Sequence, residues 1–135
     1  MSSFVIYDTS VLIHLIRSGA LFEKIYDGAP IVRNSSVVLA ELWRGASAQA
    51  DREFVRWMQD NFRILSPTEN HWIESGKILA RMQADHGFEP KKLRELHFDV
   101  LIALTARAHG ARLITSNRTD FELIRGYRVF ELEVW

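Results

Sequence analysis

The chain has 135 residues, of which 47% are hydrophobic and 25% are charged, so its composition is that of one folded domain and excludes a disordered chain. Its formal net charge of zero excludes the overall basic composition of many nucleic-acid-binding proteins, although a local basic patch is compatible with it. The absence of cysteine excludes disulfides and thiolate metal sites. The sequence has no membrane-spanning apolar run and no signal-peptide pattern, and we therefore expect a cytoplasmic protein without a membrane contact.

The first segment predicts a strand followed by a helix. Residues 4–7 are apolar and β-prone, which predicts a buried strand, and residues 11–16 predict a helix. Thr9 or Ser10 is expected to cap this helix. Asp8 lies where the strand ends and the helix begins, and in open α/β sheets ligands bind outside the carboxyl ends of the strands. Asp8 is therefore either a candidate site residue or a turn and capping residue.

The next segment repeats this order. An amphipathic piece at residues 21–28 precedes a predicted strand at 29–33, and a helix follows at 37–45. Glu41 lies among the apolar residues of this helix, which is unusual for a charged side chain. It is either a candidate site residue or a surface glutamate paired with Arg44, three residues further on.

The middle of the chain is expected to be mainly helical. Residues 49–60 predict an amphipathic helix, residues 62–65 a short strand and residues 68–86 a long helix. Trp72 is expected on the inward face of the long helix. Residues 88–95 are expected to form a connector.

Another unusual carboxylate, Asp99, lies at the start of the next predicted helix. The residues that follow it are apolar almost all round the helix, which indicates packing on more than one side. A charge at the mouth of such a helix is costly unless something pairs with it. Asp99 is therefore either a helix cap or a member of a cluster of carboxylates, whereas the nearby His97 is interpreted as a partly buried structural histidine.

The last segment contains two more predicted strands, at residues 112–115 and 127–132, with a polar turn at 116–121 between them. Strands that alternate with helices predict an α/β domain with a central, mostly parallel sheet of four to five strands flanked by helices. No repeat or linker divides residues 1–135, so we expect a single domain.

The carboxylates of these segments would meet if their strands end at one edge of the sheet. Two carboxylates about 4 Å apart repel by roughly 4 kcal/mol at an effective dielectric constant of 20. Such a cluster needs protons or a cation, and ligands that are all oxygen favour Mg²⁺ or Mn²⁺. An ion of this kind activates water, and hydrolysis of a phosphodiester is the natural reaction.

Four motifs carry a resemblance to a known family, and they are Tyr7–Ile13, Leu39–Leu42, Phe98–Ala103 and Thr115–Phe121. Their types and their order resemble the PIN-domain family, most closely the single-domain VapC-type toxins of bacterial toxin–antitoxin pairs. The resemblance implies a three-layer PIN-like fold and a Mg²⁺- or Mn²⁺-dependent endoribonuclease that inhibits translation by cutting RNA. It also implies a cognate antitoxin protein that blocks the site, and commonly a homodimer.

The resemblance also implies roles for individual residues. Asp8, Glu41 and Asp99 correspond to the core acidic triad, with Asp8 and Asp99 as the more direct metal ligands. Glu41 would help directly or through a water. In the fourth motif, Asn117 is neutral and can orient a neighbour or a water, but it contributes no charge. Asp120 is either a ligand of a second metal ion or a cap of the helix that follows.

The residues around these acids allow two interpretations. Thr9 and Thr115 either donate hydrogen bonds to the carboxylates or serve as a helix cap and a strand end. The basic residues near the motifs either form a rim that positions an RNA strand or belong to solvated surface. These basic residues are Arg33, Arg44, Lys91, Lys92, Arg94 and Arg118.

Three other functions compete with the toxin hypothesis. A phosphoryl-transfer enzyme of the haloacid dehalogenase type would need a second aspartate two residues after Asp8, and this chain has Ser10 there. A catalytically silent module would keep the fold and act through partner contacts. A PIN nuclease that works in RNA processing without an antitoxin is the nearest alternative, and the neighbouring genes would distinguish it from a toxin.

Overall fold

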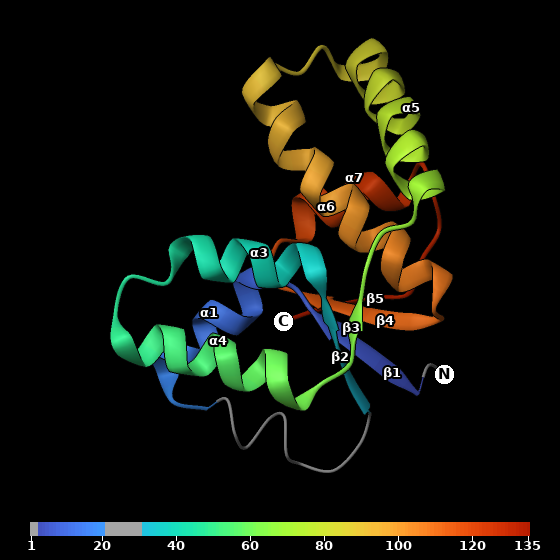
Figure 1. The fold of residues 1–135 in the computed structure, drawn as a ribbon. Coiled ribbons are helices and arrows are strands. Elements are labelled where there is room, and N and C mark those ends of the chain that lie inside the picture. Colours follow the sequence, from blue (N-terminus) through green and yellow to red (C-terminus); the bar gives the residue numbers. More distant parts are fainter. Residues whose placement is uncertain (1–2, 21–30) are drawn as a thin grey trace.

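The structure is a computed structural model that describes residues 3–20 and 31–135 (Figure 1). Within these ranges the strands form one five-stranded sheet in the order β3-β2-β1-β4-β5, and every neighbouring pair is parallel. This confirms the prediction of a mostly parallel sheet. The amphipathic piece expected at 21–28 and the first two residues of the strand expected at 29–33 lie outside the described residues. The strands are β1 (Phe4–Tyr7), β2 (Ile31–Ser35), β3 (Ile64–Leu65), β4 (Ala111–Thr115) and β5 (Leu132–Val134).

Helices cover the sheet in two groups. In Figure 1, α1, α3 and α4 are gathered at one side of the molecule, and α5, α6 and α7 are gathered at the other. The described part of the chain therefore has the expected α/β architecture, with a parallel sheet flanked by helices. The helices are α1 (Thr9–Ser18), α3 (Ser36–Gly45), α4 (Gln49–Asn61), α5 (Glu69–His86), α6 (Pro90–Ala108) and α7 (Arg118–Arg125).

The strand order places a switch in chain direction at the middle of the sheet. From β1 the chain adds β2 and β3 on one side, and then it returns to add β4 and β5 on the other. Strands β1 and β4 are therefore neighbours, with Tyr7 opposite Ile114, and the backbone N–H of Asp8 donates to the carbonyl of Ile114 at 2.8 Å. Ligands of open α/β sheets bind at such a switch point, beyond the carboxyl ends of the strands.

The expected connector at 88–95 is wrong, because most of it is the first part of α6. The helix begins at Pro90, with Glu89 as its N-cap residue. Proline is favoured at the first helical position because its fixed φ suits the helix and no N–H is needed there. The Lys, Leu, Arg and Glu residues that follow are good helix formers. As a consequence, Asp99 lies in the middle of α6 and is not a helix cap.

Two further expectations are corrected. The final strand, expected at 127–132, is β5 at Leu132–Val134, and β5 pairs in parallel with β4. Trp72 does not face inward, since it is 51% exposed on α5. In α5 the buried residues are Ser75, Ile78 and Met82. The face of α5 that packs on the core is therefore narrower than the positions of its apolar residues suggested.

Helix α6 supplies the centre of the core, as its sequence indicated. Its residues from Val100 to Ala106 are all buried, including the polar Thr105, whose hydroxyl donates to the carbonyl of Leu101. A helix buried on several sides in this way holds its polar side chains in fixed positions. No helix in residues 3–20 and 31–135 is long and apolar enough to cross a membrane.

Candidate active site

Asp8 lies at the switch point, between β1 and α1. It occupies the N-cap position of α1, yet its side chain makes no capping bond, and its backbone carbonyl accepts from Val11 and Leu12 instead. The carboxylate is 5% exposed and is held by two hydroxyls, because Ser10 donates to Oδ2 at 2.8 Å and Thr115 donates to the same oxygen at 2.9 Å. The side chain of Asp8 is therefore directed into the site and away from the helix end.

These hydroxyls are oriented by backbone groups of the turn after β4. The N–H of Asn117 donates to the Thr115 hydroxyl at 2.9 Å, and the N–H of Ser116 donates to the Ser10 hydroxyl at 3.3 Å. Each hydroxyl accepts from the backbone and donates its own proton to Asp8, so each bond polarises the next. The hydrogen bond from Thr115 was expected as one of two alternatives, whereas Ser10 was expected only as a helix cap and this contact was missed.

Glu41 faces the same region from α3. Its Oε1 accepts from the hydroxyl of Thr9 at 2.9 Å, across 32 residues of sequence. Burial raises the pKa of the Glu41 carboxyl, and the negative charge of Asp8 raises it further, while the hydrogen bond from Thr9 and the charge of Arg44 lower it. The interpretation of Glu41 as a surface residue paired with Arg44 is therefore incomplete, because Glu41 is partly buried and accepts a hydrogen bond from Thr9.

Asp99 is the most strongly perturbed carboxyl of the site. Burial, followed by the negative charges of Asp8, Asp120 and Glu41, raises its pKa to about 8, and the positive charge of Lys92 acts in the opposite direction. A carboxyl in this state retains a proton at neutral pH unless a cation neutralises the charges around it. The acids of four sequence segments therefore do act on one another, which the sequence alone did not establish.

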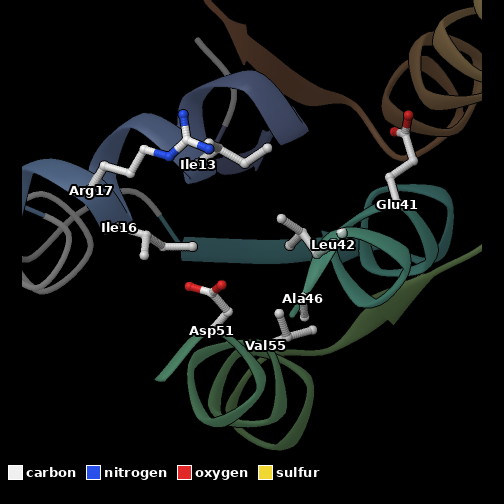
Figure 2. Close-up of a pocket in the computed structure, with 9 residues that line it drawn as sticks. Ile13, Ile16, Arg17, Glu41, Leu42, Ala46, Asp51 and Val55 are labelled. Atoms are coloured by element: carbon white, nitrogen blue, oxygen red, sulfur yellow. The ribbon is translucent and has the colours of Figure 1, made fainter. Parts of the chain in front are cut away.

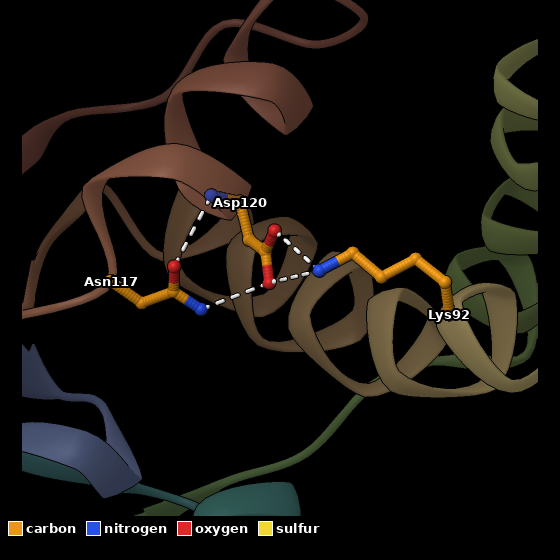
Figure 3. Close-up of polar contacts among 3 residues, drawn as sticks. All are labelled: Lys92, Asn117 and Asp120. Atoms are coloured by element: carbon orange, nitrogen blue, oxygen red, sulfur yellow. Dashed lines mark hydrogen bonds and ion pairs between the residues drawn. The ribbon is translucent and has the colours of Figure 1, made fainter. Parts of the chain in front are cut away.

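The fourth motif forms a small network with α6 (Figure 3). Asn117 is the N-cap of α7, and its Oδ1 accepts from the backbone N–H of Asp120 at 3.2 Å. Its amide nitrogen donates to Oδ2 of Asp120 at 3.0 Å, so Asn117 orients a neighbour as expected. Asp120 is inside the first turn of α7 and does not cap it, which corrects that alternative.

Lys92 completes this network, although the sequence indicated it only as one of several basic residues near the motifs. Its ammonium lies 2.8 Å from Oδ1 and 3.0 Å from Oδ2 of Asp120. The two residues are 28 positions apart and come from different helices, so their contact depends on how α6 and α7 pack. The only sequence signal was that Lys92 belonged to a short basic run, and such runs are usually solvated.

The residues of the site fit a hard divalent cation. In the described part of the chain, no three acids or imidazoles stand close enough to enclose a metal ion. Mg²⁺ does not need such an enclosure, since it keeps several waters and is usually held by one or two carboxylates together with substrate oxygens. The raised pKa of Asp99, caused in part by its acidic neighbours, shows that the site is short of positive charge. The oxygen-only donors Asp8, Glu41 and Asp99 suit that ion.

Glu41 lines two hollows. A cavity of about 100 Å³ lies between α1, α3 and α4. Figure 2 shows residues that line it, with Glu41 at one end and Arg17 and Asp51 among the others. A wider hollow of about 350 Å³ is also lined by Glu41, and Trp72 and Phe98 contribute aromatic surface to it. Asp8 and Asp99 line neither hollow, so the acidic centre is a separate feature that shares only Glu41 with them.

Comparison with solved structures returns toxin–antitoxin complexes. VapBC2 from Rickettsia felis, bound to a DNA fragment from its promoter, superimposes with a TM-score of 0.68 at 20% identity, over 98% of each chain. VapBC-1 from nontypeable Haemophilus influenzae gives a TM-score of 0.69 at 23% identity, over 98% of each chain. A toxin–antitoxin complex from Klebsiella pneumoniae gives 0.60 at 22% identity, over 87% of this chain and 89% of that one. At these identities the similarity shows a shared fold.

Comparison of the sequence itself gives a family. No functionally curated protein matches the sequence. The family described as PIN domain matches residues 5–126, and this range includes all four motifs of the acidic site. This match covers most of the 135 residues and confirms the resemblance inferred from the motifs, so the chain belongs to the PIN domain family.

Proposed function

We propose that the protein is a metal-dependent endoribonuclease that hydrolyses RNA phosphodiester bonds, and that it is the toxin of a toxin–antitoxin pair. The observation that carries this proposal is the state of Asp99, a carboxyl whose pKa is raised to about 8 by burial and by three acidic neighbours at the switch point of the sheet. A cluster of this kind is unfavourable without a cation. We take residues 1–135 as one PIN domain.

Asp8 and Asp99 would hold one Mg²⁺ or Mn²⁺ ion, and Glu41 would assist directly or through a water. When bound, such an ion lowers the pKa of water and stabilises the charge that develops on the phosphate. The hydroxyls of Ser10 and Thr115 keep Oδ2 of Asp8 in place by donating to it. Because Thr9 donates to Oε1 of Glu41, Oε2 is the oxygen that would accept a proton from the attacking water, and the raised pKa of Glu41 makes it a stronger base than an ordinary glutamate.

The surroundings of Glu41 support a nucleic-acid substrate. The hollow of about 350 Å³ beside it is lined by Arg44 and by the exposed aromatic residues Trp72 and Phe98, which are 51% and 40% exposed. Aromatic rings stack on nucleobases, and arginine contacts phosphates. A single-stranded RNA laid across this hollow would place a phosphate next to the acidic centre. In our proposal the protein acts in the cytoplasm as a homodimer.

Asn117 and Asp120 are also part of the proposed catalytic group. Asn117 holds the orientation of Asp120 through its amide nitrogen, and Asp120 contributes a negative charge that raises the pKa of Asp99. We expect both residues to affect cleavage through this local arrangement. The antitoxin partner is proposed because the solved structures similar to this chain are described as toxin–antitoxin complexes.

The test is cleavage of labelled total RNA by the purified protein with Mg²⁺, with Mn²⁺ and with a chelator. Asp99→Asn should abolish cleavage, whereas Glu95→Gln, which removes an exposed carboxylate one turn earlier on α6, should leave it unchanged. Circular dichroism would verify that both variants are folded. If folded, metal-loaded wild-type protein leaves every RNA in the pool intact, the nuclease proposal is wrong.

A second experiment addresses the toxin–antitoxin part. The chain would be co-expressed with the product of the gene next to its own, and RNA cleavage and co-purification would be measured. A protein that co-purifies and suppresses cleavage is the expected result. Cleavage without any inhibitory neighbour would instead favour a PIN nuclease of RNA processing.

A further inference from the structure

Lys92 places an ammonium group against the fourth carboxylate of the acidic site. Its Nζ lies 2.8 Å from Oδ1 and 3.0 Å from Oδ2 of Asp120, and Figure 3 shows the side chain reaching from α6 to meet both oxygens. Asp120 also accepts from the amide nitrogen of Asn117 at Oδ2. Because Asp120 is buried, at 8% exposure, these donors take the positions from which a cation would approach it.

The charges around Asp99 separate the site into two halves. Asp8, Asp120 and Glu41 raise the pKa of Asp99, and Lys92 lowers it. On the side of Asp8 the donors are the neutral hydroxyls of Ser10 and Thr115, which leave the negative charge of Asp8 in place. On the side of Asp120 the ammonium of Lys92 offsets part of the negative charge. A second divalent ion next to that ammonium would be repelled.

We propose that the Lys92 ammonium occupies the second cation position of the acidic site, so that the chain binds a single divalent ion, at Asp8 and Asp99. Asp120 is then a positioning residue that holds Lys92, and it is not a metal ligand. This inference rests on the proposed function only for the ion at Asp8 and Asp99. The motifs leave the number of metal ions open, and the inference predicts one rather than two.

The test is the number of Mn²⁺ ions bound per chain, measured by titration with the electron paramagnetic resonance signal of free Mn²⁺. We expect about one ion for the wild type, about two for Lys92→Met, and about one again for the double variant Lys92→Met/Asp120→Asn. Lys91→Met is the matched control, because it removes an exposed lysine one residue earlier on α6 and should keep about one ion. Asp8→Asn should lose the ion of the wild type.

The melting temperature supplies a second readout that does not depend on activity. Lys92→Met leaves Asp120 without its ammonium, so the metal-free variant should melt at a lower temperature than the wild type. Mn²⁺ should recover more of this loss in Lys92→Met than in the double variant, because only the single variant has a vacated carboxylate for the ion. If Lys92→Met does not fold without metal, the stoichiometry of the wild type still tests the inference, because two Mn²⁺ ions there would overturn it.

The outcomes separate this inference from the proposed function. Two Mn²⁺ ions in the wild type, with one lost in Asp120→Asn, would overturn the inference even if the protein cleaves RNA. Equal stoichiometry in the wild type and in folded Lys92→Met would also overturn it. The expected series of stoichiometries in a protein that cuts no RNA would support the inference and contradict the nuclease proposal.

Discussion

Asp8 and Asp120 are both buried carboxylates of the same acidic site, but the protein holds them in opposite ways. Asp8 accepts from two neutral hydroxyls, Ser10 and Thr115, whereas Asp120 accepts from the ammonium of Lys92 and the amide of Asn117. Hydroxyls orient a carboxylate and leave its negative charge in place. An ammonium orients the carboxylate and also offsets its charge. The comparison indicates that a site can contain four acids and still offer a cation only the carboxylates on the side of Asp8.

The largest expected difference between the two halves is in metal binding and cleavage. Asp8→Asn should lower RNA cleavage by more than about 100-fold, because even changes to residues that only orient metal ligands cost roughly 10- to 100-fold. Asp120→Asn should leave Mn²⁺ binding nearly unchanged and lower cleavage less. Isothermal titration with Mn²⁺ and a labelled RNA assay on both variants provide the measurement. Equal loss of Mn²⁺ affinity in the two would remove the distinction.

The pH dependence of stability tests how strongly the charges converge on Asp99, which lies between the two halves. Its pKa rises from the ordinary 3.8 to about 8 on folding, so between these values the metal-free folded protein keeps a proton that the unfolded chain has lost. The free energy of unfolding should therefore fall as the pH rises, by up to about 1.4 kcal/mol per pH unit from this group, and level off above about pH 8.

Urea denaturation of the metal-free protein at several pH values from 5 to 9 would measure this slope. Asp99→Asn removes the titrating group, so the variant should lack the Asp99 part of the slope and be relatively more stable at high pH. Below about pH 8, Mn²⁺ binding to the wild type should release a proton, and its affinity should rise with pH. Parallel slopes for the wild type and the variant would show that Asp99 is not perturbed.

A smaller effect is expected from removing a hydroxyl that donates to Asp8. Thr115→Val removes the hydroxyl that links the backbone of Asn117 to Asp8 while keeping the shape of the side chain. We expect Mn²⁺ affinity to fall by roughly 10-fold, as for other residues that orient a metal ligand. Thr105→Val, which removes a hydroxyl bonded only to its own helix in α6, is the control and should leave the affinity unchanged. The Mn²⁺ titration would be repeated for both.

The smallest expected effect concerns Thr9, which donates to Glu41. This hydrogen bond lowers the pKa of Glu41, so Thr9→Val should raise it further. If Glu41 accepts a proton from the attacking water, the acidic limb of the profile of cleavage rate against pH should move to higher pH. We expect only a few-fold loss of rate at neutral pH, within the range of single hydrogen bonds. An unchanged acidic limb would assign Glu41 another role.

Much of the site could be predicted from local sequence. Asp8 is placed by the strand and helix on either side of it, and Glu41 and Asp99 are conspicuous because each is a charge among apolar helical residues. Asn117 caps α7 through a contact of three residues, which is a local pattern. The start of α6 was the main local error, because a basic run was taken as a connector although Pro90 favours the beginning of a helix.

The sequence by itself determined the order of strands and helices, the four motifs and the chemical nature of the acids, because these depend on neighbouring residues and on side-chain type. Only the tertiary structure decided that Thr115 holds Asp8 and that Lys92 meets Asp120. Those contacts join residues from 28 to 107 positions apart, and they arise from the placement of β1 beside β4 and of α6 against α7. The physical reason is that a carboxylate's charge is set by its neighbours in space, and strand order and helix packing choose those neighbours.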